Sequence, residues 1–199
     1  MAKRVFIIHG WEGYPEEGWF PWLKKELEAK GFEVYVPAMP NTNEPEINAW
    51  ISCLAKQVGH ADEGTFFVGH SIGCQAILRY LESLPENQKV GGAVFVAGWV
   101  NLFLDVIKEE EGDESSCEIA KPWLETPIKW GKILSHTKNF AAIFSDNDRY
   151  VPLKDKEIFR EKLNAKIIVE HEKGHFRGSD GIVALPVVLN ELLKMATPE

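Results

Sequence analysis

The fold of this chain is decided by the nine residues TFFVGHSIG at positions 65–73. An apolar run leads into a serine, Ser71, that the small residues Gly69 and Gly73 flank. This pattern is typical of a nucleophile elbow, a strand-to-helix turn so sharp that its serine is held in a strained conformation. The motif therefore predicts that the Ser71 hydroxyl projects as a nucleophile and that the backbone N–H of Ile72 faces a developing oxyanion.

The rest of the chain alternates short apolar runs with longer helical patterns, which is typical of a parallel sheet with helices on both faces. The apolar runs are nearly continuous, and this indicates strands buried on both faces. No repeat or linker divides the sequence, so residues 1–199 are predicted to form one α/β domain with a mostly parallel sheet of about six strands. The predicted strands are 5–8, 32–36, 65–68, 93–97, 140–144 and 166–169, and the predicted helices are 19–29, 46–58, 71–84, 153–163 and 186–195.

One long connection, residues 98–139, interrupts this alternation. Connections of this length usually carry function or have structure of their own. We interpret it as a minimal cap over the site, with Trp99 and Trp123 forming an apolar wall of a substrate pocket. For its acidic run, residues 109–114, the alternative is a solvated turn between two short helices.

Composition narrows the classes of partner and compartment. The net charge of −8 and the absence of a basic stripe disfavour a nucleic-acid partner. Three cysteines without metal-like spacing suggest neither a metal site nor a disulfide framework, which fits a reducing compartment. The N-terminal apolar run is too short for a secretory signal, and no run reaches membrane-spanning length. We expect a cytoplasmic protein without a membrane partner, and nothing in the sequence specifies its oligomeric state.

A serine hydroxyl is a weak nucleophile at neutral pH, so it needs a histidine base that a carboxylate orients. In a sheet of this kind the partners follow in the order Ser, Asp or Glu, His. His175 is the predicted base, because Gly174 before it gives its loop freedom to reach the serine, and His171 at the end of a strand is the alternative. The other histidines are predicted to orient loops near the site (His9 and His70) or to lie at the surface (His60 and His136).

Two carboxylates compete to orient that base, Asp146 and Asp148, which follow a predicted strand. Ligands bind beyond the carboxyl ends of strands in open α/β sheets, so both are well placed. Asp148 is the predicted acid, because Pro152 should fix the turn with Asp148 at its apex. Asp146 is expected to accept hydrogen bonds from the turn backbone instead.

A second oxyanion donor should come from the loop after the first strand. Gly10 permits close approach of the backbone there, so the N–H of Trp11 is predicted to join that of Ile72. The predicted substrate pocket is lined by His9, Trp99, Trp123 and Phe176.

These motifs resemble the α/β-hydrolase superfamily and, more narrowly, the small serine hydrolases related to retinoblastoma-binding protein nine. The resemblance rests on His9-Gly10, the GHSIG elbow, Asp148 before a Val-Pro pair, and Gly174-His175-Phe176, and it covers nearly the full length. It implies Ser71 as nucleophile, Asp148 as acid and His175 as base. The motif Leu-X-Cys-X-Glu is missing, so binding to retinoblastoma-type pocket proteins is not implied.

We therefore expect a serine hydrolase that needs no metal or cofactor and cleaves small carboxylic esters or related acyl compounds through an acyl-enzyme on Ser71. Its expected partner is a small acyl substrate. The alternatives are an amidase or peptidase, and a protein-binding module that keeps the scaffold without the chemistry.

Overall fold

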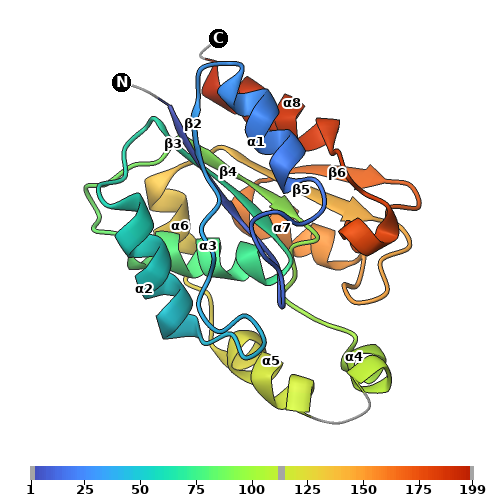
Figure 1. Ribbon diagram of the computed structural model, residues 1–199. Coiled ribbons are helices and arrows are strands. Elements are labelled where there is room, and N and C mark those ends of the chain that lie inside the picture. Colours follow the sequence, from blue (N-terminus) through green and yellow to red (C-terminus); the bar gives the residue numbers. More distant parts are fainter. Residues whose placement is uncertain (1–2, 112–114, 198–199) are drawn as a thin grey trace.

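Six parallel strands form one sheet in the computed structural model, which describes residues 3–111 and 115–197 (Figure 1). The strands are β1 (Arg4–Ile8), β2 (Glu33–Tyr35), β3 (Thr65–His70), β4 (Gly92–Val96), β5 (Phe140–Ser145) and β6 (Lys166–Glu170). Their order in the sheet is β2-β1-β3-β4-β5-β6, and every neighbouring pair is parallel. The predicted fold is confirmed, with a sheet that is parallel throughout the described strands and not merely in most of them.

Helices cover both faces of this sheet because successive side chains of a strand point to opposite faces. In β1, Val5 and Ile7 join one core cluster, whereas Phe6 and Ile8 join the other. The first cluster is closed by α1 (Phe20–Glu28) and α8 (Pro186–Ala196), and the second by α2 (Ile47–Val58), α3 (Ile72–Ser83), α6 (Trp130–His136) and α7 (Asp155–Leu163). In Figure 1, α1 and α8 lie together on one side of the sheet.

The described residues of the segment 98–139 include three helices, of which two lie away from these layers. α4 (Leu104–Glu111) and α5 (Ser115–Glu125) lie next to each other at the bottom of Figure 1, whereas α6 packs against α3. Arg79 of α3 holds α5 in place, because its guanidinium donates hydrogen bonds to the carbonyls of Trp123 and Thr126 at the end of that helix. The acidic run 109–114 covers the end of α4 and residues 112–114, which lie outside the described residues.

Two local predictions were wrong. His136, predicted at the surface, is 1% exposed, because it ends a helix that packs against α3 and its Nδ1 lies 2.8 Å from the carbonyl of Gln88. The helix predicted over 153–163 begins two residues later, at Asp155. The carboxylate of Asp155 is buried and accepts hydrogen bonds from the backbone of Val100 and Asn101, and so it fixes the start of the 98–139 segment.

None of the helices within residues 3–111 and 115–197 combines the length and the apolar composition that crossing a membrane requires.

Candidate active site

The turn at Ser71 has the geometry of a nucleophile elbow. Ser71 has φ 53° and ψ −121°, a backbone conformation that side-chain-bearing residues rarely adopt, and α3 begins at the next residue. The turn needs glycine on both sides. A Cβ at Gly73 would lie 2.3 Å from the carbonyl oxygen of Ile8, and one at Gly69 would lie 2.8 Å from the backbone nitrogen of Cys74.

Replacing Gly73 with alanine should therefore cost about 3 kcal/mol in the free energy of unfolding, because the new methyl group collides with backbone that cannot move aside. The matched control is Gly131→Ala in α6, where a Cβ meets nothing within 4 Å and alanine favours the helix by about 1 kcal/mol. Urea denaturation of the two variants measures the difference. Equal stability of the two would contradict the proposed collision.

A histidine and a carboxylate pair beside the elbow. His175 Nδ1 lies 2.8 Å from Asp148 Oδ2, with the two side chains only 5% and 3% exposed. The other oxygen of Asp148 accepts hydrogen bonds from the backbone of Tyr150 and Val151, so the carboxylate itself fixes the turn that we had expected Pro152 to fix. An ionised carboxylate can only accept, so Nδ1 of His175 carries the proton and Nε2 remains the basic atom.

The competing pair, Asp146 and His171, lies at the surface. His171 Nδ1 is 2.6 Å from Asp146 Oδ2, but the His171 side chain is 79% exposed and neither residue lines the cavity of Ser71. The backbone N–H of Glu172 donates to Asp146 and, together with His171, lowers the pKa of that carboxyl. Asp146 therefore accepts its backbone hydrogen bond from the loop after β6 and not, as expected from the sequence, from its own turn.

Side chains hold the loop that carries His175. The amide oxygen of Asn147 accepts a hydrogen bond from the backbone of Gly174, and one carboxylate oxygen of Asp180 accepts from the backbone of both His175 and Arg177. Gly174 has φ +56°, and a Cβ there would lie 2.6 Å from Cγ of Asp180. The glycine is thus needed for this close approach as well as for its backbone conformation.

The elbow also holds the histidine loop directly. His70 Nε2 lies 2.7 Å from the carbonyl oxygen of His175, so this nitrogen carries a proton and donates it. Trp19 donates its indole N–H to the next carbonyl, that of Phe176. Burial lowers the pKa of His70 to about 3, which keeps the ring neutral. His9, also buried, accepts the backbone N–H of Met39 at Nε2, so both histidines orient loops as predicted from the sequence.

The neutral His70 should make the protein sensitive to acid. In the unfolded chain this imidazole takes up a proton as the pH falls through about 6.5, whereas folded His70 stays neutral down to about pH 3. Its contribution to stability is therefore complete above pH 6.5 and is lost as the pH falls from there. In urea denaturation at several pH values, His70→Gln should give a flatter dependence of the unfolding free energy on pH than the wild type. Identical slopes would contradict the assignment.

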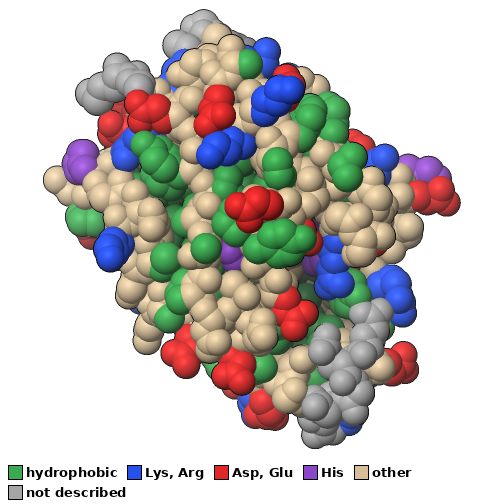
Figure 2. Space-filling model, viewed as in Figure 1, with side chains coloured by type: hydrophobic (Ala, Val, Ile, Leu, Met, Phe, Trp, Pro, Cys, Tyr) green, Lys and Arg blue, Asp and Glu red, His purple; other side chains and the backbone are tan. Residues whose placement is uncertain are grey.

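Ser71 and His175 open into one cavity of about 270 Å³. On the face of the molecule that Figure 2 shows, histidine atoms (purple) are visible near the middle, close to apolar and basic side chains. Of the four predicted pocket residues, Trp99 lines this cavity, whereas His9, Trp123 and Phe176 are buried elsewhere. The lining residues are Trp11, Glu12, Asn43, Glu44, Ser71, Ile72, Trp99, Leu102, Ile107, Ser115, Ser116, Ile119, Tyr150, His175 and Arg177.

Sequence reasoning missed several of these lining residues. Tyr150 and Arg177 had an available signal, because each lies two residues after a predicted triad member, Asp148 and His175. The apolar residues from α4 and α5 had no such signal, since nothing in a helical pattern indicates which side faces a cavity. Trp123 points the other way, and its indole N–H donates to the carbonyl of Pro45.

Both predicted oxyanion donors line the same cavity. Ile72 is the first residue of α3, and a helix N-terminus carries partial positive charge that favours an oxyanion. Trp11 belongs to the loop after β1, which is fixed because its indole N–H donates to the carbonyl of Asn43. In the described part of the chain, no group of three or more His, Cys, Asp or Glu side chains is arranged to hold a metal ion.

Several known proteins are similar to this chain in sequence, in fold, or in both. A model of the serine hydrolase family matches residues 5–194. The protein YdeN of Bacillus subtilis (strain 168) is 31% identical over 199 residues, covering 100% of this chain and 99% of that protein, and its crystal structure superposes with a TM-score of 0.85 over 98% of both chains. The serine hydrolase RBBP9 of Rattus norvegicus is 26% identical over 82% of this chain and 80% of that protein. Est1E of Butyrivibrio proteoclasticus, at 13% identity, shares the fold with a TM-score of 0.72 over 98% of this chain and 89% of its own.

Proposed function

The chain belongs to the serine hydrolase family, and from that premise we propose that it hydrolyses small carboxylic esters through an acyl-enzyme on Ser71. The observation that carries this proposal is the buried pair of His175 and Asp148, because His175 opens into the same cavity as the strained elbow serine. A small cavity of about 270 Å³ supports a short substrate.

The proposed reaction has two halves. Nε2 of His175 takes the proton of Ser71 as its oxygen attacks the ester carbonyl, and the negative charge that develops is stabilised by the N–H groups of Trp11 and Ile72. Asp148 stabilises the imidazolium. The intermediate collapses when the carbon–oxygen bond to the alcohol breaks and His175 gives its proton to the departing oxygen. Water, deprotonated by the same histidine, then releases the acid and restores Ser71.

Esters are the favoured class over amides. Two proteins share the fold at 13% and 17% identity: Est1E, whose structure holds bound ferulic acid, and the esterase PF2001 of Pyrococcus furiosus. Ester cleavage is also chemically less demanding, because an alkoxide leaves more readily than an amide nitrogen. The non-catalytic alternative is a protein-binding module on this scaffold. The buried pair of His175 and Asp148 beside Ser71 gives it no support.

Pre-steady-state kinetics on p-nitrophenyl esters and matched p-nitroanilides with acyl chains of increasing length test the proposal. We expect a burst of p-nitrophenol equal to the enzyme concentration, a preference for short acyl chains and slower cleavage of each matched anilide. Faster cleavage of the anilides would reassign the protein as an amidase. The absence of turnover on every substrate would leave the binding module.

We also propose a reducing compartment, the cytoplasm, because all three cysteines are free thiols. Quantitative alkylation of three thiols is the expected result in protein that is taken from cells and denatured without prior reduction, because Cys74 is buried in the folded protein. Fewer alkylated thiols would contradict it.

A further inference from the structure

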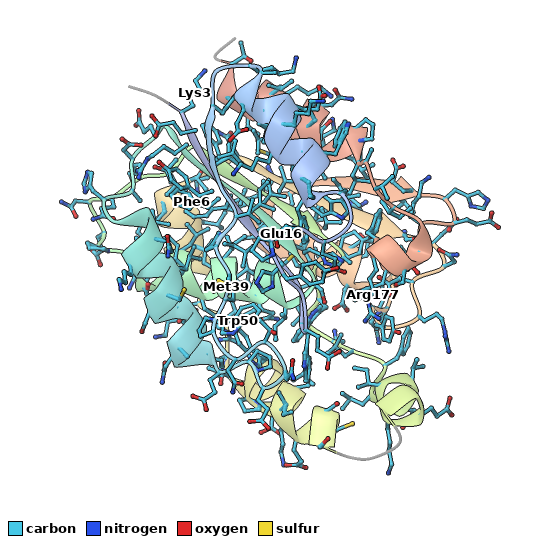
Figure 3. All side chains as sticks on the ribbon, in the orientation of Figure 1. Lys3, Phe6, Glu16, Met39, Trp50 and Arg177 are labelled. Carbon is cyan, nitrogen blue, oxygen red and sulfur yellow. The ribbon has the colours of Figure 1, made fainter. Side chains whose placement is uncertain are left out.

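Arg177 places a guanidinium in the cavity that holds Ser71 and His175, and the proposed reaction does not use it. The residue, which is labelled in Figure 3, lies just before the short helix η1 (Gly178–Asp180). Its side chain is positioned by Tyr150. The guanidinium carbon lies 4.4 Å from the centre of the tyrosine ring, and one N–H group donates to the tyrosine oxygen over 3.3 Å. A basic group is therefore held in a defined place at the reaction site.

Among the side chains that the structure describes, none forms an ion pair with Arg177. No carboxylate in residues 3–109 and 115–197 lies within ion-pair distance of this guanidinium. Glu17 is close enough for Arg177 to lower its pKa, but burial raises that pKa more strongly. A guanidinium has five N–H donors, and the described contacts of this side chain use one. Donors suited to a planar anion thus remain available.

Of the carboxylates that follow β1, Glu17 lies near Arg177 but does not line the cavity. Glu12 lines the cavity, and its backbone N–H donates to the carbonyl of Thr42 on the β2 side. Ser71 follows β3, near the centre of the sheet, and Arg177 follows β6 at one edge. Glu12 follows β1, and Glu44 lies between β2 and α2, both toward the other edge. Among the described lining residues, the two glutamates therefore lie toward β1 and β2 and the arginine lies near β6, with the serine between them.

The proposed reaction determines that the leaving group of the substrate lies on the same side of the cavity as Arg177. His175 must give its proton to the departing oxygen, so the leaving group has to lie on the side of His175. Arg177 is two residues further along the same loop, and Tyr150 lies between them, since its ring also contacts the His175 ring with centres 5.1 Å apart. The acyl portion is left to the side with the two glutamates, where an anion would be repelled.

We propose that Arg177 binds a carboxylate carried by the leaving group, so that the substrates are acyl esters of hydroxy acids. This inference rests on the proposed ester hydrolysis. The geometry favours a carboxylate, because its two oxygens match the planar fork of arginine. The charge fits as well, since Arg177 is the one lysine or arginine among the described residues that line the cavity.

The test compares 3-carboxyphenyl butyrate with 3-carbamoylphenyl butyrate, which differ in the charge of the leaving group but hardly in its size. Rates are normalised to alkaline hydrolysis of the same esters, which corrects for leaving-group reactivity. We expect wild-type kcat/KM to favour the carboxylate by roughly 10- to 100-fold. In Arg177→Met this ratio should fall to about one, whereas Arg177→Lys should keep part of it. A ratio does not change when a variant merely loses overall activity.

The matched control is Lys173→Met, which removes a positive charge from the same loop but not from the cavity lining, and it should keep the wild-type ratio. A wild-type ratio near one, or the same ratio in Arg177→Met, would overturn the inference while leaving ester hydrolysis intact. A preference for the carboxylate on the acyl side, measured with p-nitrophenyl hemisuccinate against p-nitrophenyl succinamate, would also overturn it. Failure to cleave any ester would instead refute the proposed function.

Discussion

Replacing Ser71 with alanine is expected to lower kcat/KM for short-chain esters by roughly 10⁴- to 10⁶-fold, to the residual activity of a site that has lost its nucleophile. The reason is that, in the proposed reaction, the oxygen of this hydroxyl attacks the ester carbonyl, and alanine has no atom that could do so. Steady-state assays on p-nitrophenyl butyrate measure the loss. Circular dichroism and thermal unfolding should show that the variant is folded, because the change removes one oxygen from a partly exposed side chain.

Ser83→Ala is the matched control for this loss. Ser83 is exposed at the other end of α3, where its hydroxyl donates to the carbonyl of Tyr80. The same substitution there should change kcat/KM by less than about twofold, since surface substitutions have small effects. Retention of more than a tenth of wild-type activity by Ser71→Ala would mean that another group is the nucleophile.

Replacing Asp148 with asparagine is expected to lower kcat by about 10⁴-fold. The asparagine would keep the size of the side chain, but its amide can present a donor to His175 Nδ1 and so favour the tautomer in which Nε2 carries the proton. That tautomer cannot accept the proton of Ser71. The drop should appear in kcat more than in KM, because the change affects the reaction step and not substrate contacts.

Asp146→Asn is the matched control, two residues away and also paired with a histidine. We expect it to keep kcat within a few-fold of wild type, because the Asp146–His171 pair lies outside the cavity. The two variants thus decide between the two carboxylates that the sequence left in competition. A larger loss in Asp146→Asn than in Asp148→Asn would reverse the assignment.

The sequence was sufficient to predict the fold. It was also sufficient to predict that Ser71, Asp148 and His175 follow strands that end at the same edge of the sheet. Parallel strands end at one edge of a sheet, so residues that follow β3, β5 and β6 had to meet there. The Gly-rich elbow then placed Ser71, because glycine at both flanking positions is demanded by backbone contacts that any α/β sheet with this turn would have. These are local rules, and local rules can be read from sequence.

The pocket could not be predicted in the same way. Trp99 and Trp123 have the same chemistry and lie in the same segment, yet Trp99 lines the cavity while Trp123 packs against Trp50. Trp99 follows β4, near Ser71, whereas Trp123 belongs to α5, which Arg79 of α3 holds through the carbonyl of Trp123. The burial of His136 likewise depends on how α6 packs against α3. Such tertiary contacts leave no mark in the spacing of residues.

The most direct measurement of the central claim is the site of covalent labelling by a fluorophosphonate probe, found by mass spectrometry of the intact protein and of its peptides. We predict one added phosphonyl group per chain, located on Ser71, and no label in Ser71→Ala. Labelling of another residue, or a label that persists in Ser71→Ala, would contradict the account.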